Sequence, residues 1–110
     1  MCVAMIKVTV TKRNGEYIAF ESKGHAGFAE AGRDIICSAV SALTINAVNS
    51  IDAFTDDIMH VKSEEGYLAW EFLSGTSRET RLLMDSLVLG LTQIQENYDK
   101  QYLKITIKEV

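Results

Sequence analysis

The chain has 110 residues and a formal net charge of −4, with 47% hydrophobic and 24% charged residues, which is typical of one folded domain and excludes wholesale disorder. An isoelectric point near 5.1 argues against direct nucleic-acid binding, which needs clustered lysine and arginine, and favours a basic partner. The sequence offers no signal peptide and no apolar run near the roughly 20 residues of a membrane helix, so we expect a cytoplasmic protein without a membrane partner.

The first predicted elements are two strands joined by a tight turn. Apolar residues alternate with polar ones in the first strand, the period of a half-buried strand: Ile6, Val8 and Val10. Asn14-Gly15 follows, and this pair favours a hairpin because both residues tolerate positive φ. We expect the return strand near residues 16–22, with Ile18 and Phe20 on its apolar face.

A helix is predicted next, from about Asp34 to Phe54. Apolar residues recur there every three or four positions, as on a helix that lies on a sheet: Ile36, Val40, Leu43, Ala47, Ile51 and Phe54. A second hairpin follows, with strands near residues 58–63 and 67–72. Its expected buried face consists of Leu68, Trp70 and Phe72.

The last two predicted elements are a helix and a strand. The sequence 76–79 has the spacing of a capping box, in which the Thr76 hydroxyl and the Glu79 carboxylate bond each other's backbone amides. The helix is expected to run to about Tyr98, and we attribute Gly90 within it to close packing. Its inward stripe is Leu83, Leu87, Leu91 and Ile94, and the final strand alternates through Leu103, Ile105 and Ile107.

This order of elements predicts an α+β domain of two layers. The order ββαββαβ gives a five-stranded sheet with two helices on one face. We expect one domain over residues 1–110, of which residues 1–4 are a disordered or non-native N-terminal extension.

The segment between the second strand and the first helix, 24–33, carries the candidate chemistry. Three glycines give it backbone freedom: Gly24, Gly27 and Gly32. His25 stands near its start, and if Asp34 caps the helix, Cys37 occupies the third helical position, where unpaired amides stabilise a thiolate. A cysteine and a histidine beside one loop are the minimum parts of a thiol nucleophile pair.

The same residues also allow a structural interpretation. A cysteine near a helix start is often a small buried hydrophobe, and Cys37 stands beside Ile36 and Val40. No general motif fixes the spacing of His25 and Cys37, so both interpretations stay open on the residues alone. Asp34 could orient His25 or only cap the helix, and we favour the cap because aspartate is a strong N-cap residue.

The residues from Gly24 to Ser41 resemble a known family signature. Gly24-His25-Ala26, Gly32 and the run from Asp34 through Cys37 and Ser38 to Ser41 are similar to the signature of the ribosomal-processing cysteine proteases, the Prp family. In length and element order the resemblance extends from Met5 to Val110. It implies that Cys37 is the nucleophile and His25 the general base.

The resemblance also implies a substrate and an assembly. The substrate is the N-terminal extension of a large-subunit ribosomal protein, the one numbered twenty-seven, cut after an aromatic residue in an apolar stretch, and the enzyme is a homodimer. An alternative from another class is a non-catalytic ribosome-assembly factor that binds a basic ribosomal protein on its acidic surface.

Other residues receive weaker predictions. Ser38 and Ser41 are candidates for lining a cleft, although Ser41 could instead bond back to a helix carbonyl. Phe28, in the loop, is a latch, a substrate contact or a core anchor, and we expect the loop to be open until substrate orders it. His60 is expected to be exposed and Arg33 to be a solvated charge. The aspartates near residue 56 lack the spacing of a calcium-binding loop, and we predict no metal and no cofactor.

Overall fold

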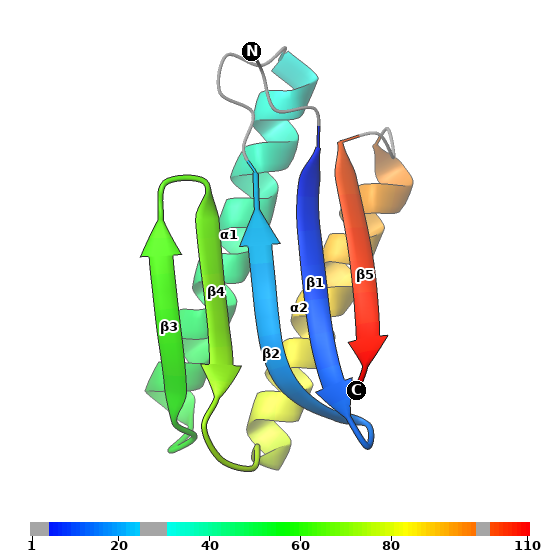
Figure 1. The fold of residues 1–110 in the computed structure, drawn as a ribbon. Helices are drawn as coiled ribbons and strands as arrows, with labels where there is room; N and C mark the ends of the chain where they lie inside the picture. Colours follow the sequence, from blue (N-terminus) through cyan, green and yellow to red (C-terminus); the bar gives the residue numbers. More distant parts are fainter. Residues whose placement is uncertain (1–4, 25–30, 99–101) are drawn as a thin grey trace.

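A computed structural model of the chain describes residues 5–24, 31–98 and 102–110. The elements are β1 (Ile6–Arg13), β2 (Glu16–Lys23), α1 (Ala31–Phe54), β3 (Met59–Glu64), β4 (Tyr67–Phe72), α2 (Arg78–Asn97) and β5 (Leu103–Glu109). The five strands form one sheet. Figure 1 shows both helices against the same face of it. The predicted two-layer α+β fold is confirmed. Residues 1–4 lie outside the described residues, so the prediction for them stays untested.

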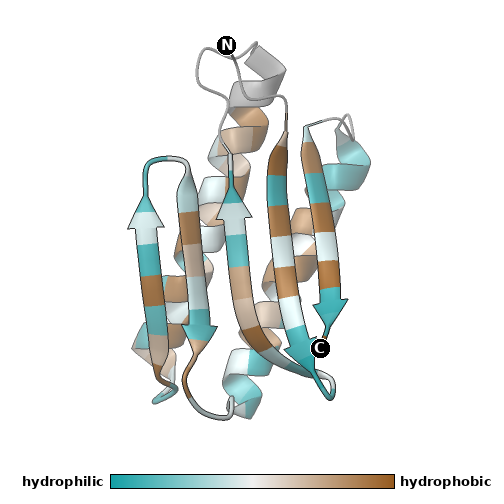
Figure 2. Cartoon of the chain, in the orientation of Figure 1, coloured by the Kyte–Doolittle hydropathy of each residue, from teal (hydrophilic) through white to brown (hydrophobic). Residues whose placement is uncertain are grey.

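The sheet order is β3-β4-β2-β1-β5. The β1–β2, β2–β4 and β3–β4 pairs are antiparallel, and β1 and β5 pair in parallel, with Ile6 opposite Leu103. Figure 2 shows the expected alternation as brown and teal bands along β1 and β5. The apolar residues of this alternation form the sheet side of the core, and the strand pairing puts β3 at one edge and β5 at the other.

The β1–β2 hairpin contains a bulge that the periodicity did not reveal. The turn is as predicted, with φ of 52° at Asn14 and 78° at Gly15. Thr11 lies opposite Ala19 but Lys12 lies opposite Tyr17, so Ile18 is the extra residue on β2. Because a bulge resets the alternation of side chains, Tyr17 is buried and Ile18 only half-buried. Ile18 is also not among the described apolar side chains that pack against the core, contrary to the prediction.

Two aromatic side chains join β2 and β4 in the core. The rings of Phe20 and Trp70 stack with centroids 4.4 Å apart and planes 18° apart. Both side chains are almost fully buried, at 1% and 2% exposure. The predicted buried face of the second hairpin holds, with Leu68 and Phe72 partly buried beside Trp70.

Helix α1 begins earlier than the sequence indicated. It starts at Ala31 instead of Asp34, so the predicted loop 24–33 loses its last residues, Gly32 among them, to the helix. The stretch Ile35–Phe54 is long and apolar enough, by length and composition, to cross a membrane, which the sequence expectation had denied. In the fold its buried positions recur at helical spacing against the sheet: Ile36, Val40, Thr44, Ala47 and Ile51. This packing accounts for the apolar composition of the helix.

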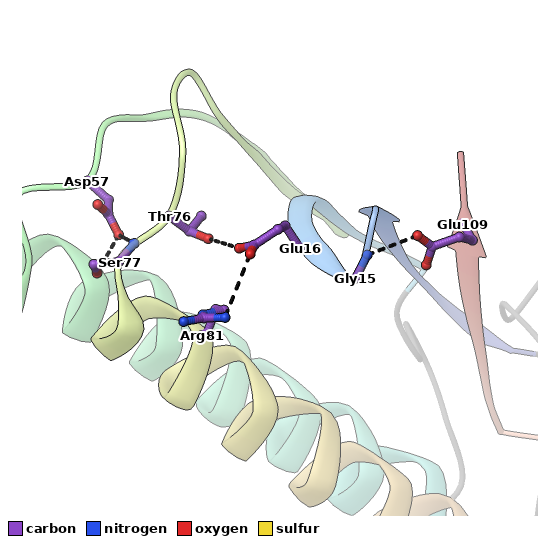
Figure 3. Close-up of polar contacts among 7 residues, drawn as sticks. All are labelled: Gly15, Glu16, Asp57, Thr76, Ser77, Arg81 and Glu109. Carbon is purple, nitrogen blue, oxygen red and sulfur yellow. Dashed lines mark hydrogen bonds and ion pairs between the residues drawn. The ribbon is translucent and has the colours of Figure 1, made fainter.

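Helix α2 begins with a cap that differs from the predicted capping box. Ser77 is the N-cap, and its Oγ accepts a hydrogen bond from the Thr80 backbone N–H at 3.2 Å. The Asp57 carboxylate accepts hydrogen bonds from the Ser77 N–H at 2.8 Å and from the Ser77 hydroxyl at 2.7 Å (Figure 3). It also accepts one from the Thr80 hydroxyl. The Thr76 hydroxyl instead donates to Glu16 at 3.3 Å. The capping box was wrong because a carboxylate from the α1–β3 connection takes the place of Glu79.

The inner face of α2 agrees with the prediction in part. Leu87 and Leu91 are buried, whereas Leu83 and Ile94 are only partly buried. Met84 and Thr80, which the predicted stripe omitted, are fully buried. A Cβ on Gly90 would lie 2.9 Å from Cδ1 of Leu43, so the close packing inferred for this glycine is confirmed. The final strand is covered only at its start, since Leu103 is buried and Ile107 is 55% exposed.

Asp57 is expected to stabilise the fold in its charged form. Burial alone would raise the pKa of Asp57, but the hydrogen bonds from Thr80 and Ser77 outweigh burial and hold the pKa below its ordinary value. Asp57→Ala removes the carboxylate that accepts hydrogen bonds from Ser77 and Thr80 at the start of α2. This loss should lower the free energy of unfolding by about 1–2 kcal/mol at neutral pH. Urea denaturation measures this loss.

The pH dependence provides the control for Asp57. A carboxyl group whose pKa is lower in the folded than in the unfolded protein stabilises the fold at pH values above its unfolded-state pKa. This stabilisation is lost as the pH falls through the folded-state pKa. The difference between wild type and Asp57→Ala should therefore shrink in acid, below roughly pH 4. Asp56→Ala, at the exposed neighbouring carboxylate, should change stability little at either pH. An equal loss for both variants would contradict the capping role.

Candidate active site

Cys37 lies on α1 at the edge of the core. It is half-buried and packs against the buried cluster. Since α1 begins at Ala31, Cys37 belongs to the second helical turn and not to the third helical position. Charge stabilisation by a helix N-terminus falls off within the first turn, so this contribution to a thiolate is weaker than the sequence suggested.

The position of Asp34 also corrects the prediction. Asp34 is within the first turn of α1, so it is not the N-cap residue, and the favoured capping role was wrong. The other interpretation, that Asp34 orients His25, remains a prediction. Asp34 precedes Cys37 by three residues, a spacing that puts two residues on neighbouring positions of a helix surface.

The strand side of the site is fixed at Gly24. This residue follows β2 with φ of 101°, in the region that favours glycine, and its N–H donates to the carbonyl of Gly66 at 2.8 Å. The bond ties the end of β2 to the β3–β4 turn. Of the predicted loop, His25, Ala26, Gly27 and Phe28 lie outside the described residues, so the general base and the opening of the loop stay predictions.

A cleft of about 470 Å³ lies between α1 and the β3–β4 hairpin. Its wall on α1 contains Ser41, Thr44, Ile45, Val48 and Asn49; its other walls contain Ser22, Gly24, Val61, Ser63, Glu64, Gly66, Tyr67 and Leu68. Ser41 lines the cleft as predicted, whereas Ser38 is exposed and is absent from this lining. The Ser41 carbonyl accepts a hydrogen bond from the Thr44 hydroxyl at 3.1 Å.

One end of the cleft includes residues that are near the predicted catalytic pair in sequence. Ser41 follows Cys37 by one helical turn on the same face of α1, and Gly24 directly precedes His25. Figure 1 shows the β3–β4 turn at the same end of the molecule as the start of α1. From that end the cleft continues along α1 toward Val48.

The described lining of the cleft combines apolar, polar and charged side chains. Among the described residues that line it, Glu64 alone carries a charge, and its carboxylate lies 3.6 Å from the Lys62 ammonium. Both partners of this ion pair are largely exposed, so the pair contributes little stability. The Tyr67 hydroxyl donates to Glu21 at 2.9 Å, and this bond raises the pKa of Tyr67. A peptide with apolar side chains and a positive charge is complementary to this lining.

Sequence reasoning missed the apolar cleft residues. Ile45 of α1 is 51% exposed, Val61 of β3 is 43% exposed, and both line the cleft. The only sequence signal was that Ile45 falls outside the buried stripe of α1. His60 is exposed as predicted, on β3, with its Nδ1 3.9 Å from the Glu71 carboxylate.

Known proteins match this chain over nearly its whole length. The model of the family described as Cysteine protease Prp matches residues 5–104. Ribosomal processing cysteine protease Prp of Bacillus subtilis is 31% identical over 109 residues, which cover 93% of this chain and 96% of the relative. The Prp of Staphylococcus aureus strain Mu50 is 26% identical over 99 residues, which cover 87% of this chain and 93% of the relative.

Solved structures share the fold. The crystal structure of SMU.848 from Streptococcus mutans superposes with a TM-score of 0.86 at 29% identity, covering 96% of this chain and 99% of that chain. The ribosomal processing protease Prp of S. aureus, in complex with a covalently linked product peptide, gives a TM-score of 0.84 at 25% identity, covering 94% and 100%. The chain therefore belongs to the Prp family and is a cysteine protease.

Proposed function

We propose that this cysteine protease removes the N-terminal extension of the large-subunit ribosomal protein numbered twenty-seven during ribosome assembly. The observation that carries the proposal is the family match over residues 5–104, together with a peptide-sized cleft whose lining includes Ser41, one helical turn after Cys37. The relatives from B. subtilis and S. aureus are named as ribosomal processing proteases, and one S. aureus structure holds a product peptide.

The proposed chemistry uses two side chains. His25 takes the proton of Cys37, and the thiolate attacks the carbonyl carbon of the scissile bond. The imidazolium then protonates the leaving amine, which leaves an acyl thioester on Cys37. Water, deprotonated by His25, attacks the thioester, releases the carboxylate product and restores the thiol.

The charge of the protein suits the proposed substrate. The chain has a net charge of −4, and Glu64 adds a carboxylate to the lining of the cleft. Ribosomal proteins are basic because they contact RNA phosphates. An extension that combines apolar residues with nearby lysines or arginines could pack against the apolar side chains of the lining and pair with the Glu64 carboxylate.

Incubation with the ribosomal protein that carries its extension tests the function. Intact mass spectrometry should show the loss of one N-terminal fragment, and alkylation of Cys37 beforehand should prevent that loss. Binding without any change in mass would favour the alternative, a non-catalytic assembly factor. A substrate cut at many positions would contradict a processing role.

We also propose that the protein is a cytoplasmic homodimer, as the family resemblance implies. Leu82 and Leu89 are 69% and 60% exposed on α2, and their spacing of two turns puts them on one face of the helix. An exposed apolar stripe of this kind is available for a second copy. Sedimentation equilibrium should give twice the chain mass of 12.2 kDa.

Asp34→Asn is expected to lower kcat by on the order of 10² while leaving KM nearly unchanged. The substitution preserves size and hydrogen-bonding ability but removes the charge that would orient the His25 imidazole and stabilise its charged form. Steady-state kinetics across pH should also show a shift in the pH at which kcat rises, the rise that we attribute to loss of the proton from His25. Kinetics and a pH profile equal to those of the wild type would leave Asp34 without a role in catalysis.

A further inference from the structure

We propose that the substrate peptide binds as an additional strand on the open edge of β3, with alternate side chains in the cleft between α1 and β3. The inference rests on the proposed peptide-cleaving function and specifies how the peptide is held. It also assigns a binding role to Val61, Ser63 and Ile45.

The edge of β3 has backbone groups available for a partner strand. Among the described strands, β3 ends the sheet, and β4 is its neighbour. The Leu73 N–H donates to the Ile58 carbonyl at 2.9 Å, and Ile58 and Leu73 continue the register that puts Met59 opposite Phe72. Along an antiparallel strand, residues whose backbone groups hydrogen-bond to the neighbouring strand alternate with residues whose backbone groups point away from it. His60 and Lys62 therefore direct their backbone groups toward β4.

The residues between them face the open edge. By the same alternation, Val61 and Ser63 direct their N–H and C=O groups away from β4. Their side chains line the cleft on the helix-covered side of the sheet. Each of these two residues thus offers a donor and an acceptor to a peptide backbone and a side chain to the same cleft.

The apolar surface of the cleft is exposed where such a peptide would lie. Ile45 of α1 and Val61 of β3 are 51% and 43% exposed. A strand added beside β3 would run about 4.8 Å from it, and every second side chain would point toward α1. Those side chains would cover Ile45 and Val61, which no described segment of the chain covers.

Continuity with the catalytic site identifies the occupant as the substrate. Glu64 ends β3 and is followed by the turn whose Gly66 carbonyl accepts the Gly24 N–H at 2.8 Å. Glu64 and Ser41, which follows Cys37 by one helical turn, line the same cleft, so a peptide that runs along β3 approaches Cys37 at its Glu64 end. The apolar residues on one side of the scissile bond would lie along β3, and the bond itself would lie beyond Ser63.

The opposite edge of the sheet offers a matched control. On β5, the Val110 N–H donates to the Lys12 carbonyl at 2.9 Å, so alternation directs the Ile107 amide away from β1. Ile107 also has its side chain on the helix side, at 55% exposure, but does not line the cleft. Proline is tolerated on edge strands where the missing N–H faces outward.

The first test uses the wild-type enzyme and peptides that each carry one backbone N-methyl group. Strand addition predicts that methylation of alternate residues on the apolar side of the scissile bond raises KM about five- to tenfold, the effect of one lost hydrogen bond. Methylation of the residues between them should change KM less than twofold. An equal effect at every position would overturn strand addition. Cleavage of the unmodified peptide separately tests the proposed function.

The second test is Val61→Pro beside Ile107→Pro. Val61→Pro should raise KM by at least fivefold, because it removes an edge donor and its ring obstructs the added strand, whereas Ile107→Pro should keep the wild-type KM. Circular dichroism melting shows whether both variants fold. If Val61→Pro folds and keeps the wild-type KM, the proposal is wrong; if it does not fold, the methylation scan decides alone.

Discussion

Replacing Cys37 by alanine is expected to reduce cleavage of the ribosomal protein to the uncatalysed level and to leave the fold intact. Alanine cannot supply the electron pair that attacks the scissile carbonyl, so no acyl-enzyme forms. The structural cost is small, since Cys37 is only half-buried and the change removes a single sulfur atom. We expect a loss of about 1 kcal/mol or less in the free energy of unfolding.

Two measurements on Cys37→Ala separate chemistry from folding. Intact mass of the substrate reports cleavage, and urea denaturation reports stability. Cys2→Ala, which changes the other cysteine of the chain, is the matched control and should cleave at the wild-type rate. Cleavage by Cys37→Ala near the wild-type rate would eliminate Cys37 as the nucleophile.

His25→Ala is expected to lower kcat by roughly 10²- to 10⁴-fold, the usual contribution of a general base. The remaining activity should rise with pH, because hydroxide can then form the thiolate that the imidazole no longer generates. Steady-state kinetics between mild acid and mild alkali measure both effects. KM should change much less than kcat if the cleft and not His25 binds the peptide.

The second histidine of the chain provides the control. His60 is 70% exposed on β3, and its side chain alternates with those that line the cleft. His60→Ala should keep the wild-type kcat and pH profile. A similar loss in both variants would indicate that histidine removal impairs folding, and a loss in His60→Ala alone would contradict the assignment of the base.

Much of the fold could be predicted because strands and helices differ in apolar period. The alternation through Ile6 and Val8 and the helical spacing from Ile36 to Ile51 each specify one element. The prediction failed at positions decided by distant residues. Ile18 is displaced by a register shift with β1, and the cap of α2 depends on Asp57, which lies 20 residues before Ser77.

For the site, the sequence supplied a chemical hypothesis that stays a prediction. His25 and Cys37 are close in sequence, and a family resemblance named them together. The cleft could not be predicted, since Ile45 and Val61 come from different elements and face each other only after β3 pairs with β4. The start of α1 was missed because Gly32 weakens the helical pattern, although the helix continues through it.

The parallel pairing of β1 with β5 has a consequence for the order of folding. Val10 pairs with Ile107, so the sheet is completed by a contact between two strands that are far apart in the sequence. Contacts of such long sequence separation slow folding, and a ribosome releases the N-terminal part of a chain first. Cys37 on α1 therefore leaves the ribosome well before β5, the strand that completes the sheet. We expect nascent chains without β5 to lack the cooperative unfolding transition of the finished protein.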